Sequence, residues 1–222
     1  MRANEFTLCK PLIVAGIGTE VGKTIVSAIL VKALDADYWK PVQCGEDHPS
    51  DKSTVTSLVD STTLICHAEA YSFKAPLSPH KAAKLENREI DLSHIKLPNT
   101  RNPIIIECAG GLFVPYADHL LQIDVMQTLN CPWILVSRHY LGSINHTLMS
   151  IEILRSRHCK LAGIIFNGTD TFGAEEIIVK QTNVPILGHL SEEPLIHCKN
   201  QSKSIINRYS NEWKPQLSTI YN

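Results

Sequence analysis

Short, continuous apolar runs alternate along the chain with longer segments whose apolar residues recur every three or four positions. Continuous runs are typical of strands buried on both faces, whereas the three-to-four spacing is typical of helices with one buried stripe. The runs predict strands at residues 12–15, 38–43, 71–73, 103–107, 133–137, 161–166 and 184–187, the last as an edge strand. The periodic segments predict helices at residues 23–34, 50–59, 118–129, 143–157, 172–182 and 195–208, a helix that starts at Ser78, and a short helix within 87–102.

This order of strands and helices predicts a single α/β domain over residues 1–222, built as a doubly wound, mainly parallel sheet with helices on both faces. In such a sheet, ligands bind beyond the carboxyl ends of the strands. The segments that directly follow predicted strands are therefore the candidates for a site. They are residues 16–24, 40–45, 107–111, 138–145 and Asn167.

Composition agrees with a globular protein and excludes several classes of partner. Of the 222 residues, 44% are hydrophobic and 19% are charged, which suits a domain with a substantial core. The formal net charge is −1 and no basic block occurs, so there is no electrostatic case for nucleic acid or an anionic membrane as a partner. The chain has no apolar run near the roughly eighteen residues of a spanning helix and no apolar signal core at its start, so we expect a cytoplasmic protein. The seven cysteines include no Cys-x-x-Cys pair, and this pattern favours reduced thiols over a zinc site.

The most informative stretch is Gly16-Ile17-Gly18-Thr19-Glu20-Val21-Gly22-Lys23-Thr24, between a predicted strand and a predicted helix. Glycines let backbone N–H groups converge on phosphate oxygens, and a helix N-terminus adds partial positive charge. In a phosphate-binding loop of the P-loop NTPase type, Lys23 would reach the β- and γ-phosphates and the Thr24 hydroxyl would bind Mg²⁺. The strict spacing would place a glycine at Ile17, and this chain has it one residue earlier, at Gly16. A plain glycine turn is the alternative, and the flanking elements favour the nucleotide loop.

Charged and polar residues after the other strands can complete such a site. Glu107 ends a strand and is an expected direct or indirect Mg²⁺ ligand, with an acid satisfied by backbone N–H groups as the alternative. Asp51 is a weaker candidate for the same ion, because helix capping alone would explain it. Lys40 could neutralise charge on a transferred phosphoryl group, but its spacing does not distinguish this role from that of a surface lysine. Gly142-Ser143 opens a helix whose N-terminus could attract a carboxylate, although an ordinary serine cap explains the pair by itself.

Taken together, these motifs resemble the dethiobiotin synthase family. The resemblance covers residues 12–190 and rests on residues 16–24, Lys40-Pro41-Val42-Gln43, Ser78-Pro79-His80, Glu107 with Ala109-Gly110-Gly111, Leu141-Gly142 with Ile144-Asn145-His146, and Asn167. It implies an ATP-dependent ligase of biotin biosynthesis that converts 7,8-diaminononanoate and CO₂ into dethiobiotin with Mg²⁺ as cofactor. In that family a substrate amine forms a carbamate, which attacks the γ-phosphate to give a carbamic–phosphoric anhydride. The neighbouring amine then closes the ureido ring and expels phosphate.

The same resemblance implies roles for individual residues. Lys23 and Lys40 are the implied catalytic residues, which stabilise the transferring phosphoryl group and the carbamate oxygens. The implied Mg²⁺ ligands are Thr24, Asp51 and Glu107. The implied nucleotide-binding residues are Glu20, Val21, Gly22, Lys23, Thr24, Ile25, Asp51, Glu107, Cys108, Ala109, Gly110, Asn167, Gly168, Leu190, Ser191 and Glu192, of which Asn167 would read the adenine edge. The implied substrate-binding residues are Thr19, Cys44, Gly142, Ser143, Ile144 and Asn145, and in this family the helix start at 142–145 comes from the other subunit of a homodimer.

Five positions depart from the family pattern without removing a charged catalytic group, so they bear on affinity more than on chemistry. Gly18 stands where Asp is usual, Ile17 replaces Thr, Cys44 replaces a substrate-contacting Ser, Cys108 replaces Gly, and Ser191 replaces Pro. The alternative function is a nucleotide-switch ATPase of the same superfamily that acts on a protein partner. Such ATPases carry an extra lysine where this chain has Gly18, which argues against that function. A non-catalytic binding protein is a further alternative that the substitutions leave open.

Overall fold

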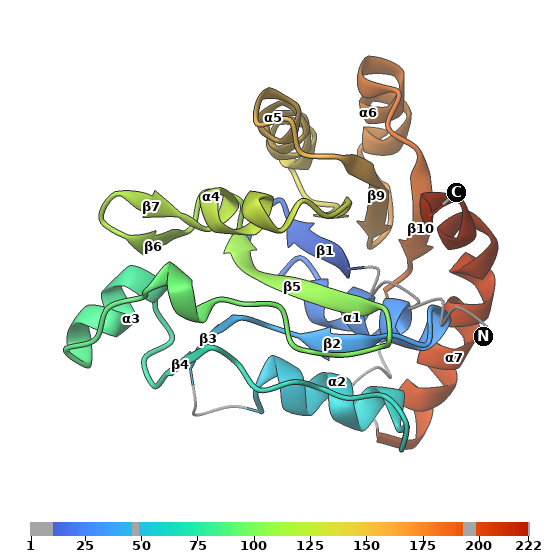
Figure 1. The fold of residues 1–222 in the computed structure, drawn as a ribbon. Coiled ribbons are helices and arrows are strands. Elements are labelled where there is room, and N and C mark those ends of the chain that lie inside the picture. The colour runs from blue at the N-terminus through green and yellow to red at the C-terminus, as the bar shows by residue number, and fades with distance from the viewer. Residues whose placement is uncertain (1–10, 46–48, 193–198, 222) are drawn as a thin grey trace, which may run out of the picture.

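A computed structural model describes residues 11–45, 49–192 and 199–221. Its centre is a six-stranded sheet whose neighbouring strands all pair in parallel (Figure 1). The strand order is β10 (Ile186–Leu190), β9 (Leu161–Asn167), β8 (Trp133–Arg138), β1 (Pro11–Gly16), β5 (Ile104–Gly111) and β2 (Asp37–Trp39). The sheet confirms the predicted parallel architecture, and β10 is an edge strand as expected.

Helices cover both faces of this sheet, as Figure 1 shows. One face packs against α4 (Gln122–Met126), α5 (Ser143–Ser156) and α6 (Ala174–Thr182), with α3 (Pro79–Leu85) contributing Ala82 and Ala83. The other face packs against α1 (Lys23–Ala33), α2 (Asp51–Val59) and α7 (Lys199–Leu217). None of the described helices is long and apolar enough to cross a membrane.

The continuous apolar runs arise because each central strand contributes side chains to two hydrophobic cores, one on each face of the sheet. Along β1, Ile13 and Ala15 lie in one core, whereas Leu12 and Val14 lie in the other. Successive side chains of a strand point to opposite faces, so a strand covered on both faces needs apolar residues at every position. The same alternation places the side chain of Glu107 on the face of β5 that looks towards α1.

The strand predicted at 38–43 is wrong as a single element. β2 ends at Trp39, and β3 (Val42–Cys44) instead pairs in parallel with β4 (Tyr71–Phe73) in a separate two-stranded sheet. Pro41 lies at the break, where it lacks the N–H that a ladder requires, while its carbonyl accepts a hydrogen bond from the Tyr71 N–H at 3.0 Å. The break turns Lys40 out of the main sheet at its carboxyl edge.

The helix predicted at 118–129 is correct only in its second part. Strands β6 (Pro115–Ala117) and β7 (Leu120–Leu121) form an antiparallel hairpin, and the helix begins at Gln122. The Asp124 carboxylate accepts a hydrogen bond from the Leu121 N–H at 3.1 Å and so marks that start. A short 3₁₀ turn, Gln127–Leu129, completes the segment, and another at Leu92–His94 matches the short helix expected within 87–102.

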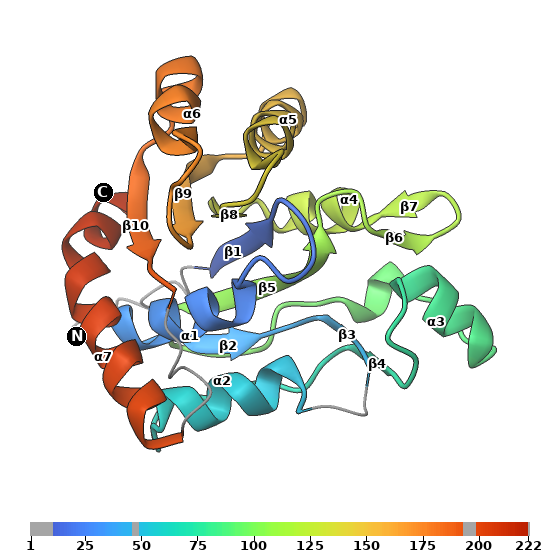
Figure 2. The same ribbon diagram turned by 180° about the vertical axis from the view of Figure 1, so that it is seen from behind.

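The last helix is longer than the sequence pattern indicates. Residues 195–198 of the prediction lie outside the described residues, and α7 continues past Arg208 to Leu217, followed by a 3₁₀ turn at Ser218–Tyr221. Figure 2 shows α7 running along the outside of the sheet, beside α1. Trp213 is buried against β10, where a Cβ atom on Gly188 would lie 2.5 Å from its ring. The segment after Arg208 is therefore part of the core.

Candidate active site

The loop after β1 has two positions that only glycine can occupy. Gly22 has a φ of 95°, and a Cβ atom there would clash with the amide nitrogen of Asn167. A Cβ atom on Gly16 would lie 2.6 Å from the Val21 side chain. The amide of Asn167 donates a hydrogen bond to the Val21 carbonyl at 2.9 Å, which ties the loop to the end of β9. Glycine at 16 rather than 17 is thus what lets the chain fold back over Val21.

Helix α1 begins at Lys23 with no side-chain cap and no acidic residue in its first turn. Its first N–H groups and its dipole are therefore available to an anion. The Lys23 ammonium group lies over the loop and donates to the Gly18 carbonyl at 2.8 Å. Burial lowers the pKa of Lys23, and the nearby Glu107 carboxylate partly offsets this effect. The loop has the form of an anion site with a cation beside it.

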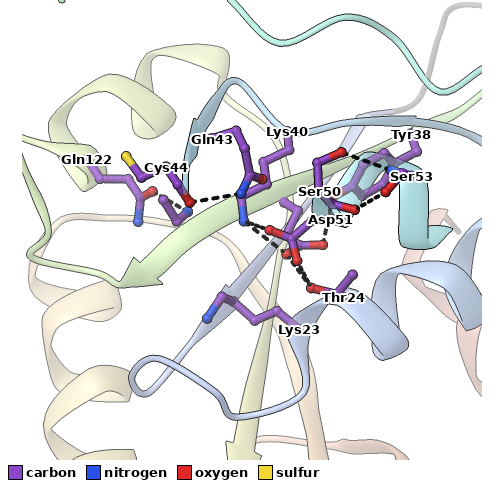
Figure 3. Close-up of polar contacts among 12 residues, drawn as sticks. Lys23, Thr24, Tyr38, Lys40, Gln43, Cys44, Ser50, Asp51, Ser53 and Gln122 are labelled. Atoms are coloured by element: carbon purple, nitrogen blue, oxygen red, sulfur yellow. Dashed lines mark hydrogen bonds and ion pairs between the residues drawn. The ribbon is translucent and has the colours of Figure 1, made fainter. Parts of the chain in front are cut away.

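Four side chains from four segments meet beside this loop. Figure 3 labels three of them, Thr24, Lys40 and Asp51. The Thr24 hydroxyl lies 2.5 Å from Asp51 Oδ1 and 3.0 Å from Glu107 Oε1. The Lys40 ammonium group is hydrogen-bonded to Asp51 Oδ2 and lies 3.6 Å from Glu107 Oε1. Thr24 comes from the first turn of α1, Asp51 from the first turn of α2, Glu107 from β5 and Lys40 from the break after β2. One hydroxyl, two carboxylates and one ammonium group therefore form a single cluster.

These contacts decide between the alternatives that the sequence left open. The cap of α2 is Ser50, whose hydroxyl accepts a hydrogen bond from the Ser53 N–H at 3.2 Å, so the Asp51 carboxylate is free of capping. Among the described residues, the Glu107 carboxylate pairs with side chains rather than with backbone N–H groups. Lys40 is only 8% exposed and is not a surface lysine. All three charged groups point into the cluster instead of serving local structure.

Mutual pairing sets the protonation of the cluster. Burial alone would lower the pKa of Lys40, but the Glu107 and Asp51 carboxylates outweigh burial and hold that pKa above its usual value. Burial alone would raise the pKa of Asp51, whereas the Lys40 ammonium group and the Thr24 hydroxyl hold it below its usual range. Both groups are therefore charged at neutral pH.

The donor set fits a magnesium ion. Mg²⁺ prefers hard oxygen ligands and takes one or two carboxylates together with phosphate oxygens and water. Thr24 Oγ1 lies within 3.0 Å of an oxygen of each carboxylate, so the three oxygen donors already converge. Among the described residues, no sulfur or imidazole ligand takes part in this convergence, which disfavours zinc.

A cavity of about 350 Å³ lies over the cluster and the loop. Each residue that lines it is a predicted site residue: Thr19, Glu20, Gly22, Lys23, Thr24, Ile25, Lys40, Asp51, Glu107 and Gly110.

Two other predicted nucleotide contacts point away from this cavity, since Val21 and Cys108 are buried in opposite cores. Burial raises the pKa of the Cys108 thiol to about 12, so this cysteine is a neutral core residue. Only the backbone of Cys108 can face a ligand, because strand alternation sends its side chain away from Glu107.

The residues expected at the adenine lie together at the ends of β9 and β10. The Gly168 N–H donates to the Leu190 carbonyl at 2.8 Å, and the Ser191 N–H donates to the Tyr209 hydroxyl at 3.1 Å. A Cβ atom on Gly168 would lie 3.9 Å from Glu192 Oε1. Tyr209 was missed from the sequence because the predicted helix stopped one residue before it.

The residues expected at the substrate carboxylate form a separate and more open region. Gly142, with a φ of 101°, precedes α5, and Ser143 is the first helical residue rather than a cap. The Ser143 hydroxyl is buried and finds no hydrogen-bond partner among the described residues. Leu141 is 86% exposed and Met149, two turns later, is 54% exposed; Asn145 is exposed between them. Apart from Thr19, the expected substrate contacts do not line the phosphate cavity.

Cys44 ends β3 and is half-buried. Burial raises the pKa of its thiol to about 11, so it is neutral at physiological pH. A neutral thiol is a weak hydrogen-bond donor compared with a hydroxyl. A cysteine instead of a serine at position 44 therefore weakens the hydrogen-bond donor without adding a charge.

Two further residues support the cluster and carried no sequence signal. Tyr38 donates its hydroxyl proton to Glu107 Oε2 at 2.9 Å. Gln122 accepts a hydrogen bond from the Ala109 N–H at 2.6 Å and donates one to the Gly111 carbonyl at 2.9 Å, which fixes the glycine-rich end of β5. Both contacts join residues whose proximity only the fold creates.

A histidine–carboxylate cluster occupies the rim at β8 and β10. Glu175 of α6 bridges His139 at 2.9 Å and His189 at 2.7 Å, and each imidazole ring stacks against the Phe166 ring. Asp170 accepts hydrogen bonds from the N–H groups of Ala174 and Glu175, so its carboxylate caps α6. These contacts explain the cluster as a brace between strands and α6.

Comparison with known proteins places the chain in a family. The AAA domain family model matches residues 10–200. The ATP-dependent dethiobiotin synthetase BioD of Chlamydia pneumoniae is 45% identical over 203 residues, which cover 91% of this chain and 89% of that protein. The BioD proteins of Christiangramia forsetii and Cytophaga hutchinsonii are 41% and 44% identical, over 95% and 90% of this chain and 99% and 95% of theirs. The chain belongs to the ATP-dependent dethiobiotin synthetase family.

Membership of the dethiobiotin synthetase family confirms the resemblance found in the motifs. Solved structures resemble the fold at much lower identity. A ParA family ATPase from Chlorobium tepidum gives a TM-score of 0.56 at 14% identity over 92% of this chain and 96% of that one. The septum site-determining protein MinD of Pyrococcus horikoshii gives 0.52 at 15% identity over 96% of this chain and 93% of its own. At such identity the likeness concerns the fold alone, and it confirms a P-loop ATPase architecture for this dethiobiotin synthetase family member.

Proposed function

We propose that this protein is an ATP-dependent dethiobiotin synthetase that carboxylates 7,8-diaminononanoate with CO₂ and closes the ureido ring, releasing ADP and phosphate. The observation that carries the proposal is the cluster of Lys40, Thr24, Asp51 and Glu107 beside an anion-binding loop. Phosphoryl transfer depends mainly on positioning and on electrostatic stabilisation. The buried Lys40 ammonium group, the oxygen donors around it and the N-terminus of α1 can together position the phosphoryl group and stabilise its charge.

In the proposed reaction the loop and the two lysines act on the phosphoryl group. The carbamate oxygen attacks the γ-phosphorus, the bond from phosphorus to the β,γ-bridging oxygen breaks, and ADP leaves. The N–H groups of residues 20–25 and the Lys23 ammonium group hold the β- and γ-phosphates. Lys40 faces the attacking carbamate and balances the negative charge that gathers between it and the γ-phosphate. The second amine then attacks the anhydride carbon and expels phosphate, which completes the ring.

Thr24, Asp51 and Glu107 would hold Mg²⁺ beside the phosphates. The bound ion would neutralise phosphate charge and polarise the γ-phosphoryl group. The support for this assignment is the convergence of hard oxygen donors around Thr24 Oγ1. In the same proposal Asn167, Gly168 and residues 190–192 bind the adenine, and the backbone of residues 108–110 lies against the nucleotide.

We further propose a homodimer in which residues 142–145 of one subunit complete the substrate site of the other. The start of α5 offers a helix N-terminus for the substrate carboxylate, and two exposed apolar residues lie near it, Leu141 just before the helix and Met149 within it. Thr19 and Cys44 would contact the diamine end of the substrate from the same subunit as the phosphate loop. This arrangement divides one pocket between a phosphate end and a carboxylate end.

A phosphate-release assay with mass-spectrometric detection of the organic product tests the proposed function. Full-length protein with Mg-ATP should release phosphate and form dethiobiotin only when both diaminononanoate and bicarbonate are present. Omitting each compound in turn is the matched control. Phosphate release that ignores the diamine and responds to a protein partner would contradict the proposal and favour a nucleotide-switch ATPase.

A further inference from the structure

Tyr38 is a buried polar residue for which the proposed mechanism has no use. It lies on β2, its side chain is fully buried, and its backbone pairs with Ile105 of β5. Glu107 lies two residues further along β5, on the same face of the sheet. A phenol is long enough to cover that diagonal step, and its hydroxyl donates to Glu107 Oε2 at 2.9 Å.

The two oxygens of Glu107 have different surroundings. Oε2 accepts from Tyr38, and among the described residues no other hydrogen bond to it is found. Oε1 instead faces the cavity, at 3.0 Å from the Thr24 hydroxyl and 3.6 Å from the Lys40 ammonium group. Glu107 is only 1% exposed, so water does not satisfy Oε2 from bulk solvent. The Tyr38 hydroxyl therefore fixes which oxygen turns towards the cavity.

Tyr38 is itself held firmly. Its N–H donates to the Ile65 carbonyl at 2.9 Å, and its carbonyl accepts from the His67 N–H at 2.8 Å. The neighbouring Asp37 carboxylate accepts hydrogen bonds from the Ile65 N–H, Thr100 and Asn102 at 2.6 to 2.9 Å, and it lies 3.0 Å from His67 Nε2. This network locks the edge strand, so the phenol can act as a fixed donor rather than following the carboxylate.

We propose that Tyr38 is a positioning residue that holds Glu107 with a single oxygen, Oε1, presented to the metal. The inference rests on the proposed Mg²⁺ site. A small octahedral ion demands strict ligand geometry, and a carboxylate held by its outer oxygen cannot swing to chelate with both. Groups that orient metal ligands in this way typically change metal affinity by about 10- to 100-fold when they are removed.

The test uses Tyr38→Phe, which removes one oxygen atom and keeps the ring that fills the core. Mn²⁺ binding to the full-length, ADP-saturated protein, measured by electron paramagnetic resonance, gives a readout that is independent of activity. We expect the dissociation constant for Mn²⁺ to rise about tenfold, with ADP binding in the presence of a chelator unchanged. In a Glu107→Gln background the same change should add no further loss, because the oriented carboxylate is already absent.

Tyr71→Phe is the matched control, since Tyr71 is buried and its hydroxyl is bonded to the backbone of Asp91, away from the cluster. It should bind Mn²⁺ as the wild type does. Wild-type affinity in Tyr38→Phe would overturn the positioning role while leaving the metal site standing. Equal losses in both tyrosine variants, or a further loss in the Glu107→Gln background, would also overturn it, because they would indicate general loosening. If the wild type binds no Mn²⁺, the proposed metal site itself fails.

Discussion

The two ends of the predicted substrate pocket differ in how complete they are within one chain. At the phosphate end, Lys40 and Glu107 are almost fully buried and are paired with Asp51 and Thr24 from other elements. At the start of α5, Leu141 and Asn145 lie in the open. Buried charges must be paired to be tolerated, so the phosphate end has to be complete within a single chain. The exposed start of α5 carries no buried charge that must be paired, so this end of the pocket can be completed by a second copy of the chain.

This difference teaches that the two ends should fail in different ways. Damage at the phosphate end should remove phosphoryl transfer regardless of assembly. Damage at the α5 end should affect the diamine and the oligomeric state while nucleotide binding persists. Variants at each end can therefore test whether phosphoryl transfer and diamine binding depend on separate parts of the molecule.

The largest expected effect follows Lys23→Ala. Loss of the ammonium group at the phosphate loop should lower kcat for ADP formation by about a thousandfold, because the other described cation that bonds to this loop, Arg138, donates to the Glu20 carbonyl at 3.3 Å and does not line the cavity. A coupled assay of ADP production measures it. Lys32→Ala, on the same helix and outside the cavity, should keep full activity. Substantial activity in Lys23→Ala would contradict the loop assignment.

Lys40→Ala should lower kcat by about a hundredfold while ATP binding is largely kept. The carboxylates of Asp51 and Glu107 hold the pKa of Lys40 above its usual value, so the wild type should not lose this contribution as pH rises towards the ordinary lysine pKa of about 10.4. Turnover against pH, together with ATP binding by calorimetry, checks both points. Lys52→Ala, whose charge faces Glu69 at 3.8 Å, is the control. Unchanged turnover in Lys40→Ala would remove its catalytic role.

Leu141→Glu tests the α5 end of the pocket, where we expect it to weaken both dimer formation and diamine binding. A charge on this 86% exposed leucine should shift the protein from dimer to monomer and raise the KM for diaminononanoate about tenfold, with the KM for ATP unchanged. Sedimentation and substrate titrations measure the two effects. Leu85→Glu places the same charge on a 59% exposed leucine of α3 and should change neither. A dimeric, fully active Leu141→Glu protein would disprove the shared pocket.

The smallest effect is expected for Cys44→Ser. Burial raises the pKa of the Cys44 thiol to about 11, so the change replaces a neutral weak donor by a stronger one. One added hydrogen bond should lower the KM for diaminononanoate about two- to tenfold, with kcat nearly constant. Steady-state kinetics with Cys159→Ser as control measure this. A higher KM would indicate that Cys44 does not face the substrate.

Much of the fold follows from the sequence because its signals are local. The buried strands were predicted from continuous apolar runs, and the loop at 16–24 from its glycines and its place between strand and helix. The errors lie where tertiary contacts overrule a local pattern. Pro41 divides an apparently continuous strand between two sheets, and Leu120 and Leu121 read as helical but pair in a hairpin. Helix α7 continues past its predicted end because the Trp213 ring packs against Gly188 of β10, which has no side chain to exclude it.

The candidate site divides in the same way. The sequence by itself determined the form of the loop at 16–24, the candidate phosphate loop, since Gly16, Gly22, Lys23 and Thr24 are near neighbours whose geometry depends on short-range backbone freedom. It also nominated Lys40, Asp51 and Glu107 as residues that follow strands, but it left each with a structural alternative. Only the tertiary structure decided that they meet, that Ser50 and not Asp51 caps α2, and that Tyr38 reaches Glu107. The physical reason is that such contacts depend on which strands lie side by side, and an apolar run specifies that a strand is buried without specifying its neighbours.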